Sequence, residues 1–208
     1  MSKPNRWGLL AVVMLAATVG VIPTVLAQEP GWRLTGGATH AWFGGGATDT
    51  TGSGLSFGPT SSLAWSLGAD HPVGRVRVGL QLSYFTASLQ ISGSGVRIVS
   101  ENTDFSEVQL AALVSLPLLR VGASGAGFTL ALGPTVDFWS ITDTDGRTRG
   151  GAIAALLFGA PIAPRWTLLA AAAGTLSGSP FNASELPVEF EPSTLLGGRV
   201  GLGLRYGD

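Results

Sequence analysis

Residues 75–87 read RVRVGLQLSYFTA, and from Val76 to Tyr84 every second side chain is apolar. The positions between them carry Arg77, Gly79, Gln81 and Ser83. Successive side chains of a β-strand point to opposite faces, so this period of two predicts a strand with one aliphatic and one polar face. The same alternation recurs in residues 105–118 and 194–206.

Eight strand-like runs follow one another after residue 30. We expect strands at residues 32–43, 55–68, 75–87, 105–118, 128–139, 151–159, 166–175 and 194–206. Three connectors are short and contain Gly or Pro, at residues 69–74, 120–125 and 160–165. Four are longer and polar, at residues 44–54, 91–104, 140–150 and 176–192. Short periplasmic turns and longer external loops are typical of outer-membrane barrels. The sequence therefore predicts an all-β fold, an eight-stranded antiparallel up-and-down transmembrane β-barrel with both termini in the periplasm.

The first 27 residues read as a cleaved signal peptide. Lys3 and Arg6 precede an apolar stretch at residues 9–22, and the small residue Ala27 ends a segment that a signal peptidase would recognise. The apolar stretch is shorter than the roughly 20 residues that a membrane-spanning helix needs. We therefore expect residues 28–208 to form the barrel domain.

Composition narrows the class of protein. The chain has no cysteine, which excludes disulfides and thiolate metal sites, and its charged residues make up 12%. The mature chain would carry ten arginines against thirteen acidic residues, a net charge of −3 without the basic patch that nucleic-acid binding requires. Mean hydropathy is +0.37, although no apolar run after the leader is long enough for a membrane helix. This combination is typical of a membrane barrel, in which lipid-facing and lumen-facing positions alternate.

Aromatic residues are expected in two girdles on the lipid face. We place Trp32, Trp166 and Tyr206 at the periplasmic ends of their strands, and Trp42, Phe57 and Tyr84 near the outer ends. Pro134 falls inside the fifth strand, where a missing N–H has to be accommodated by a bulge or a local break.

Charged residues also fall on the inward faces of the expected strands. These residues are Arg33, Arg77, Glu107, Asp137, Arg199 and Arg205. An eight-stranded interior is filled by side chains, so charges there are costly unless they are paired. We expect a polar plug in the lumen, with Arg199 near the middle bridging toward Glu107 and Asp137.

The chain resembles the small eight-stranded outer-membrane barrels, the group with the OmpA transmembrane domain, OmpX-like and OmpW-like proteins. The likeness covers about residues 29–208, and its most specific part is the last strand. Arg199, Gly201, Leu204 and Tyr206 match the spacing of the signal that the barrel-assembly machinery reads in this family. Gly207 and Asp208 follow the aromatic residue, whereas it is usually terminal. The resemblance implies an integral outer-membrane protein whose partners are outer-membrane lipids and, during biogenesis, the assembly machinery.

Enzymatic residues are sparse. Lipid A deacylases, which are also barrels of this kind, use a histidine and a serine two residues apart on one strand. Here the residue two before His40 is Ala38 and the residue two after it is Trp42, so that pair is absent. His71 precedes Pro72 in an expected turn. We therefore predict no catalytic, cofactor or metal site, and read His40 as an interfacial residue.

The predicted function is that of a non-enzymatic outer-membrane barrel with a plugged lumen. Eight strands leave room only for side chains, so the external loops, chiefly residues 176–192, would serve adhesion, a partner protein or surface protection. Two alternatives stay open: a soluble exported lipocalin-like carrier of a small apolar ligand, and a lipid-modifying membrane enzyme.

Overall fold

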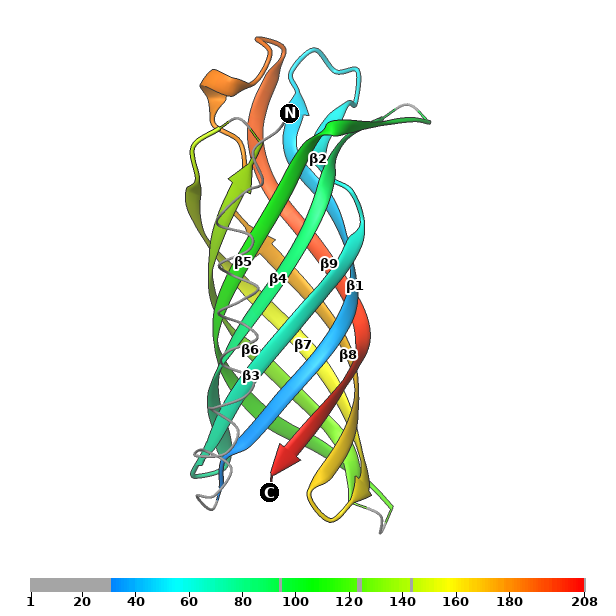
Figure 1. The fold of residues 1–208 in the computed structure, drawn as a ribbon, viewed down its shortest axis with the longest axis vertical. Helices are drawn as coiled ribbons and strands as arrows, with labels where there is room; N and C mark the ends of the chain where they lie inside the picture. Colours follow the sequence, from blue (N-terminus) through cyan, green and yellow to red (C-terminus); the bar gives the residue numbers. More distant parts are fainter. Residues whose placement is uncertain (1–30, 94, 123–124, 143, 208) are drawn as a thin grey trace.

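A computed structural model describes residues 31–93, 95–122, 125–142 and 144–207 of the 208-residue chain. The expected signal peptide lies outside the described residues. The described chain forms one antiparallel sheet that closes on itself as a barrel (Figure 1). Its strands are β1 (Arg33–Asp49), β2 (Ser56–Pro59), β3 (Ser62–Val73), β4 (Val76–Gly93), β5 (Val96–Val121), β6 (Ala126–Ile141), β7 (Arg147–Ala163), β8 (Trp166–Ser177) and β9 (Phe190–Gly207).

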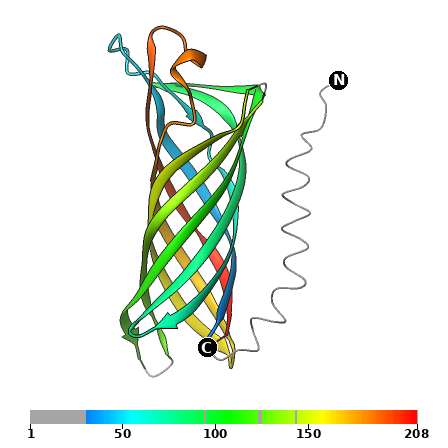
Figure 2. The ribbon, with the colours of Figure 1, turned by 90° about the vertical axis from the view of Figure 1, so that its left-hand side faces the viewer.

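The ring has eight strand positions, as predicted. Neighbours in sequence pair antiparallel from β3 to β9, and β9 pairs with β1 to close the barrel. The second position is shared by two elements, because β2 and β3 both pair with β1 and with β4. The up-and-down order brings residue 33 opposite Gly207, so the described chain begins and ends at the same rim (Figures 1 and 2).

The turns at that rim are shorter than the sequence indicated. The predicted turn at residues 69–74 was wrong, because β3 continues through Asp70, His71 and Pro72 and only residues 74–75 separate it from β4. Gly74 takes a φ of 64°, a left-handed conformation that a two-residue hairpin requires. The β7–β8 turn is equally tight, at residues 164–165. The pairs of strands are therefore longer than expected at this end.

At the opposite rim, the predicted loop at residues 91–104 is also wrong. β4 and β5 continue as a hairpin in which Leu89 pairs with Ser100 and Gly93 with Val96. The hairpin extends beyond the rim and leans away from the barrel (Figure 1). Because Ser, Asn and Gly favour turns and loops, this polar segment was predicted as a loop although it forms paired strands. The remaining outer connectors are residues 50–55, 142–146 and 178–189, and the last contains the short helix η1 (Ala183–Glu185).

Pro134 occupies the predicted interruption. The β5–β6 ladder pairs Ala111 with Thr135 and then Val114 with Leu132, and no pairs join the residues between them. The register is the same on both sides of the gap. At Gly133 the backbone approaches the carbonyl oxygen of Ala112 so closely that an added Cβ would overlap it. Pro134, which has no N–H, thus follows Gly133, which has no side chain. β6 passes this interruption of the ladder without a change of register.

Buried apolar side chains gather at the outer end of the barrel, where β1, β4, β5, β6 and β9 meet. No helix within the described ranges is long and apolar enough to cross a membrane.

Candidate functional site

Alternation sorts the side chains of the barrel into two classes. The outer face carries exposed large apolar residues on every ring strand, such as Leu80 (58% exposed) and Leu202 (63%). The inner face carries small and polar residues, including Thr35, Ser66, Gln81 and Ser115. A soluble protein would bury the first class and expose the second. The surface therefore suits lipid, and the soluble lipocalin-like alternative is disfavoured.

Two aromatic groups border this apolar surface. Trp166 and Tyr206 lie 5.0 Å apart between ring centres at the rim with the short turns, and Phe128 and Phe158 are also 5.0 Å apart. On β6 the outward residues Phe128 and Phe138 are ten positions apart. At about 3.4 Å per residue and a tilt of about 40°, this separation spans roughly 26 Å, close to the height of an outer-membrane apolar band.

One of the aromatic residues lies elsewhere than expected. Phe57 on β2 packs edge-on against Phe190 with ring centres 4.4 Å apart and contacts the buried core, so it is not part of a lipid-facing girdle. Trp32 lies with its ring centre 5.1 Å from that of His71, which alternates with inward-facing Asp70 and so shares the outer face at the rim with the short turns. His71 itself pairs with Val78 inside the sheet and is not a turn residue.

His40 is exposed on the outer face of β1. Its strand neighbours are Leu63 and Val200, and its ring centre is 6.4 Å from that of Trp42. These surroundings are apolar and aromatic. Within the described ranges, no group of three or more potential metal ligands occurs.

The lumen contains two polar clusters, and they include all six residues singled out from the sequence. The first lies at the rim with the short turns. There Asp70 Oδ1 accepts a hydrogen bond from Arg33 Nε at 3.0 Å and another from Arg77 Nε. Arg205 interacts electrostatically with the same three residues. Asp70 was missed because residues 69–74 read as a turn rather than as the inward face of a strand.

The second cluster lies deeper and is almost fully buried. Glu107, Asp137 and Arg199 are 2%, 0% and 4% exposed. Arg199 Nη2 is 3.8 Å from Glu107 Oε2, a long ion pair, and Gln109 Nε2 donates to Asp137 Oδ1 at 2.9 Å and to Glu107 Oε1 at 3.4 Å. The expected ion pair with Glu107 is present. Gln109, rather than Arg199, makes the direct contact with Asp137.

Between the two clusters the lumen holds a cavity of about 120 Å³. Its lining is polar on one side, with Thr35, Ser66 and Gln81, and apolar on the other, with Ile153 and Leu169. Asp70 and Arg199 are among the residues at its two ends.

An aromatic layer closes the outer end of the lumen. Phe85 is 1% exposed and stacks on Phe43 with ring centres 4.8 Å apart, and it meets the edge of Trp139 at 5.8 Å. Phe105 contacts both Trp139, at 6.4 Å, and Phe181, at 5.7 Å. We call these five residues the aromatic layer. Sequence reasoning did not find it, because its members come from four strands and a loop and meet only when the barrel is closed.

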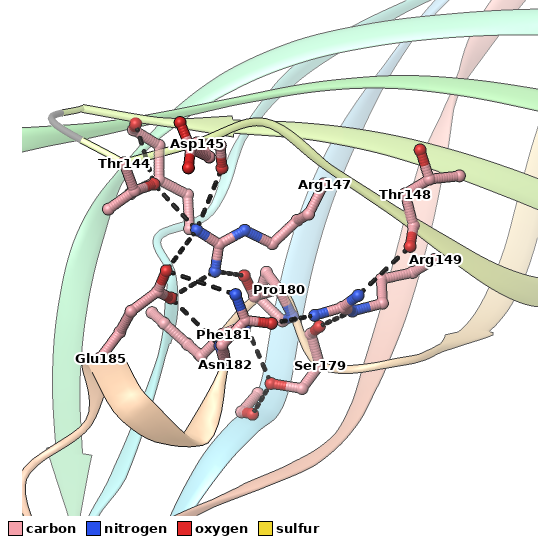
Figure 3. A network of polar contacts seen from close by, with 12 residues as sticks. Thr144, Asp145, Arg147, Thr148, Arg149, Ser179, Pro180, Phe181, Asn182 and Glu185 are labelled. Carbon is pink, nitrogen blue, oxygen red and sulfur yellow. Dashed lines mark hydrogen bonds and ion pairs between the residues drawn. The ribbon is translucent and has the colours of Figure 1, made fainter.

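The last outer loop folds over this layer and is held there by arginines of β7 (Figure 3). Arg147 donates to the carbonyl of Pro180 at 2.8 Å and to Thr144 Oγ1 at 2.9 Å, and it pairs with both oxygens of Glu185. Because Pro180 and Phe181 are buried, the loop is a packed cap rather than a free polar segment. We call residues 178–189 the cap.

Arg149 adds a second attachment for the cap. It donates to the carbonyl of Ser179 at 2.6 Å and to Asn182 Oδ1 at 2.7 Å. The Ser179 hydroxyl in turn donates to the carbonyl of Gly46 at 2.5 Å, which joins the cap to β1. Hydrogen bonding from Arg147 holds the pKa of Glu185 below its ordinary value of 4.5. At neutral pH this carboxylate is ionised and the cap is attached.

The four residues proposed as an assembly signal lie along β9. Arg199 and Gly201 face the lumen, whereas Leu204 and Tyr206 face outward. Gly201 approaches the backbone of Ala38 and Thr39 so closely that a side chain would overlap them, so closure of the barrel alone accounts for this glycine. Recognition of the four residues by the assembly machinery stays a prediction.

Comparison with solved structures identifies the architecture. Neisserial surface protein A matches with a TM-score of 0.58 at 13% identity, over 85% of this chain and 97% of that one. This chain has the fold of the small outer-membrane β-barrels. The outer membrane protein OprG from Pseudomonas aeruginosa matches with a TM-score of 0.51 at 14% identity, over 88% and 100% of the two chains. A major outer membrane protein from Thermus thermophilus matches with a TM-score of 0.50 at 12% identity, over 84% and 99%.

No family model matches the sequence, and no curated protein matches it either. The likeness of this outer-membrane barrel to the solved structures therefore concerns the fold. Together, that fold and the apolar outer face support the predicted location in the bacterial outer membrane.

Proposed function

We propose that this protein is a non-conducting, non-enzymatic outer-membrane barrel that acts through the surface it presents outside the cell. The observation that carries the proposal is the aromatic layer. Phe85 and Phe105 are at most 1% exposed, and this burial supports a lumen that is closed beside them at its outer end. A porin-type role requires a water-filled lumen through the whole barrel, and the packing of the aromatic layer argues against one.

The external surface has two distinct parts. One is the cap, which is attached to β7 by Arg147 and Arg149. The other is the β4–β5 hairpin, whose β5 arm exposes Ile98 (58%) and Val99 (45%). Apolar side chains on a protruding element are typical of a contact surface. We assign contact or surface protection to this hairpin and to the cap.

Conductance tests the closed lumen. The purified, refolded barrel in planar lipid bilayers is expected to give no stable channels beyond those of a detergent-only blank. A channel that recurs with each refolded sample would refute a closed lumen and indicate a pore.

Cysteine labelling tests the external surface, and the natural chain has no cysteine to interfere. Val99→Cys, on the hairpin, is expected to react with a membrane-impermeant maleimide on intact cells. Arg75→Cys, in the exposed β3–β4 turn, is the matched control and is expected to react only after the outer membrane is permeabilised. The reverse pattern would show that the hairpin faces the periplasm and would exclude the proposed role.

A further inference from the structure

The rim with the short turns has more positive than negative charge. Arg33, Arg77 and Arg205 point into the lumen there, and among the described residues only the carboxylate of Asp70 faces them. Among the described residues, three guanidinium groups against one carboxylate leave an excess of two positive charges. The side chains of Arg33, Arg77 and Asp70 are 16%, 17% and 21% exposed, so water reaches them but screens them only partly.

Hydrogen bonding within the cluster leaves several donors unused. Asp70 Oδ1 accepts from the Nε atoms of both Arg33 and Arg77. Arg77 also donates through Nη2 to the carbonyls of Gly31, at 2.5 Å, and Asp70, at 3.3 Å. Arg205 is different, because its Nε is buried without a partner and the residue makes no hydrogen bond with any other described residue. The terminal nitrogens of Arg33 are likewise without a hydrogen bond to the described chain.

Such an arrangement is unfavourable on its own. Like charges that are partly removed from water repel one another more strongly than they do in solution, and a guanidinium without partners loses the hydrogen bonds that water would supply. A bound anion would remove the repulsion and satisfy the unused donors together.

We propose that Arg33 and Arg205 bind a phosphate-type oxyanion at the periplasmic mouth of the lumen, with Arg77 held in place by Asp70. A phosphate dianion matches the excess of two positive charges. Its tetrahedral oxygens also accept paired hydrogen bonds from planar guanidinium groups, which Arg forms more readily than Lys does. The ligand is inorganic phosphate from the periplasm, which can carry two negative charges, or the phosphodiester of an inner-leaflet lipid headgroup, which carries one and offsets half of the excess.

Thermal unfolding in a maltoside detergent, which carries no phosphate, measures the binding. Inorganic phosphate is titrated against chloride at matched ionic strength, and a saturable rise in Tm is expected. Arg205→Gln should raise the apparent Kd for phosphate about tenfold or more, the effect of losing charge-assisted hydrogen bonds. Arg120→Gln removes an exposed arginine near the same rim and should leave the Kd unchanged.

Asp70→Asn provides a test of opposite sign. It removes the competing carboxylate, so phosphate should bind more tightly even if the barrel is less stable overall. Should this variant fail to fold, Arg33→Gln replaces it, with an expected weakening similar to that of Arg205→Gln. No saturable response in the unmodified protein, or equal losses in Arg205→Gln and Arg120→Gln, would overturn the proposal.

A water-soluble lipid distinguishes the two sources of phosphate. Dihexanoyl phosphatidylglycerol should raise Tm and compete with inorganic phosphate if the headgroup reaches the mouth from the inner leaflet. If inorganic phosphate raises Tm and the short-chain lipid does not, the free anion is the ligand.

Discussion

Replacing Arg147 by Met should release the cap while leaving the barrel folded. The Arg147 side chain is 5% exposed, and it donates to the carbonyl of Pro180, to Thr144 and to both oxygens of Glu185. Methionine keeps much of the apolar stem but removes every one of these bonds. The local free energy of opening therefore falls by the worth of a partly buried charged network.

The size of that loss follows from the exposure of the two partners. Breaking a fully buried ion pair costs about 3–5 kcal/mol, because the remaining charge has no partner. Here Glu185 is 28% exposed, so water takes over part of its solvation when Arg147 is removed. We expect a loss of about 2–3 kcal/mol for the cap, which corresponds to a decrease of roughly 30- to 150-fold in amide protection.

Hydrogen exchange measures this decrease directly. Informative amides are those of Gly178, which donates to the carbonyl of Gly150 at 3.2 Å, and Phe190, which donates to that of Pro187 at 2.9 Å. Amides within the β8–β9 ladder should keep their protection. Arg97→Met, at an exposed position on the hairpin, is the matched control and should change neither set. Unchanged exchange of the cap in Arg147→Met would show that Arg147 does not hold the cap, and the reasoning would be wrong.

Three further predictions concern the cap, the buried charges and the strand defect. The pKa of Glu185 is lower in the folded cap than its ordinary 4.5, so the stabilisation by this carboxylate is present above pH 4.5 and is lost as the pH falls through the lowered pKa. Proteolysis of the cap should therefore accelerate only in acid. Acceleration between neutral pH and pH 6 would contradict this prediction. Arg199→Leu should destabilise the barrel by about 3–5 kcal/mol in urea without adding conductance, because Glu107 loses its buried partner; a gain in conductance would indicate a gate instead. Gly133→Ala should destabilise the barrel by about 1–3 kcal/mol, since its Cβ would overlap the carbonyl oxygen of Ala112, and a neutral effect would show that the strands can separate there.

The strand number, the order of strands and the facing of side chains on the regularly alternating strands could be predicted from the sequence. Strand periodicity depends only on local backbone geometry, so Val76 and Arg77 reveal opposite faces without any knowledge of their neighbours. The six inward charges follow from the same rule. The ends of the strands could be predicted less accurately, because proline and glycine, here Pro72 and Gly74, favour turns in any sequence. In the folded chain β3 continues to Val73, and this extension brings Asp70 into the arginine cluster.

The aromatic layer and the cap depend on contacts between distant residues, which periodicity does not encode. Phe105 and Phe181 are separated by several strands in sequence, yet their rings meet at 5.7 Å. Arg147 appeared to lie in a polar loop, because Thr, Asp and Gly precede it. Arg147 is buried because the loop that contains Pro180 lies over the mouth of the barrel.

Closure of the lumen and attachment of the cap are physically linked through one residue. Phe181 is 8% exposed and packs on Phe105, so it belongs to the aromatic layer. Its neighbour Pro180 accepts the hydrogen bond from Arg147, so the same segment belongs to the attachment of the cap. When the cap opens, Phe181 leaves Phe105 and exposes apolar surface at the mouth, which adds a hydrophobic cost to the loss of the arginine bonds. A ligand that binds the opened cap must overcome both contributions, whereas one that binds the β4–β5 hairpin overcomes neither. The hairpin is therefore the surface at which contact requires no rearrangement of the barrel.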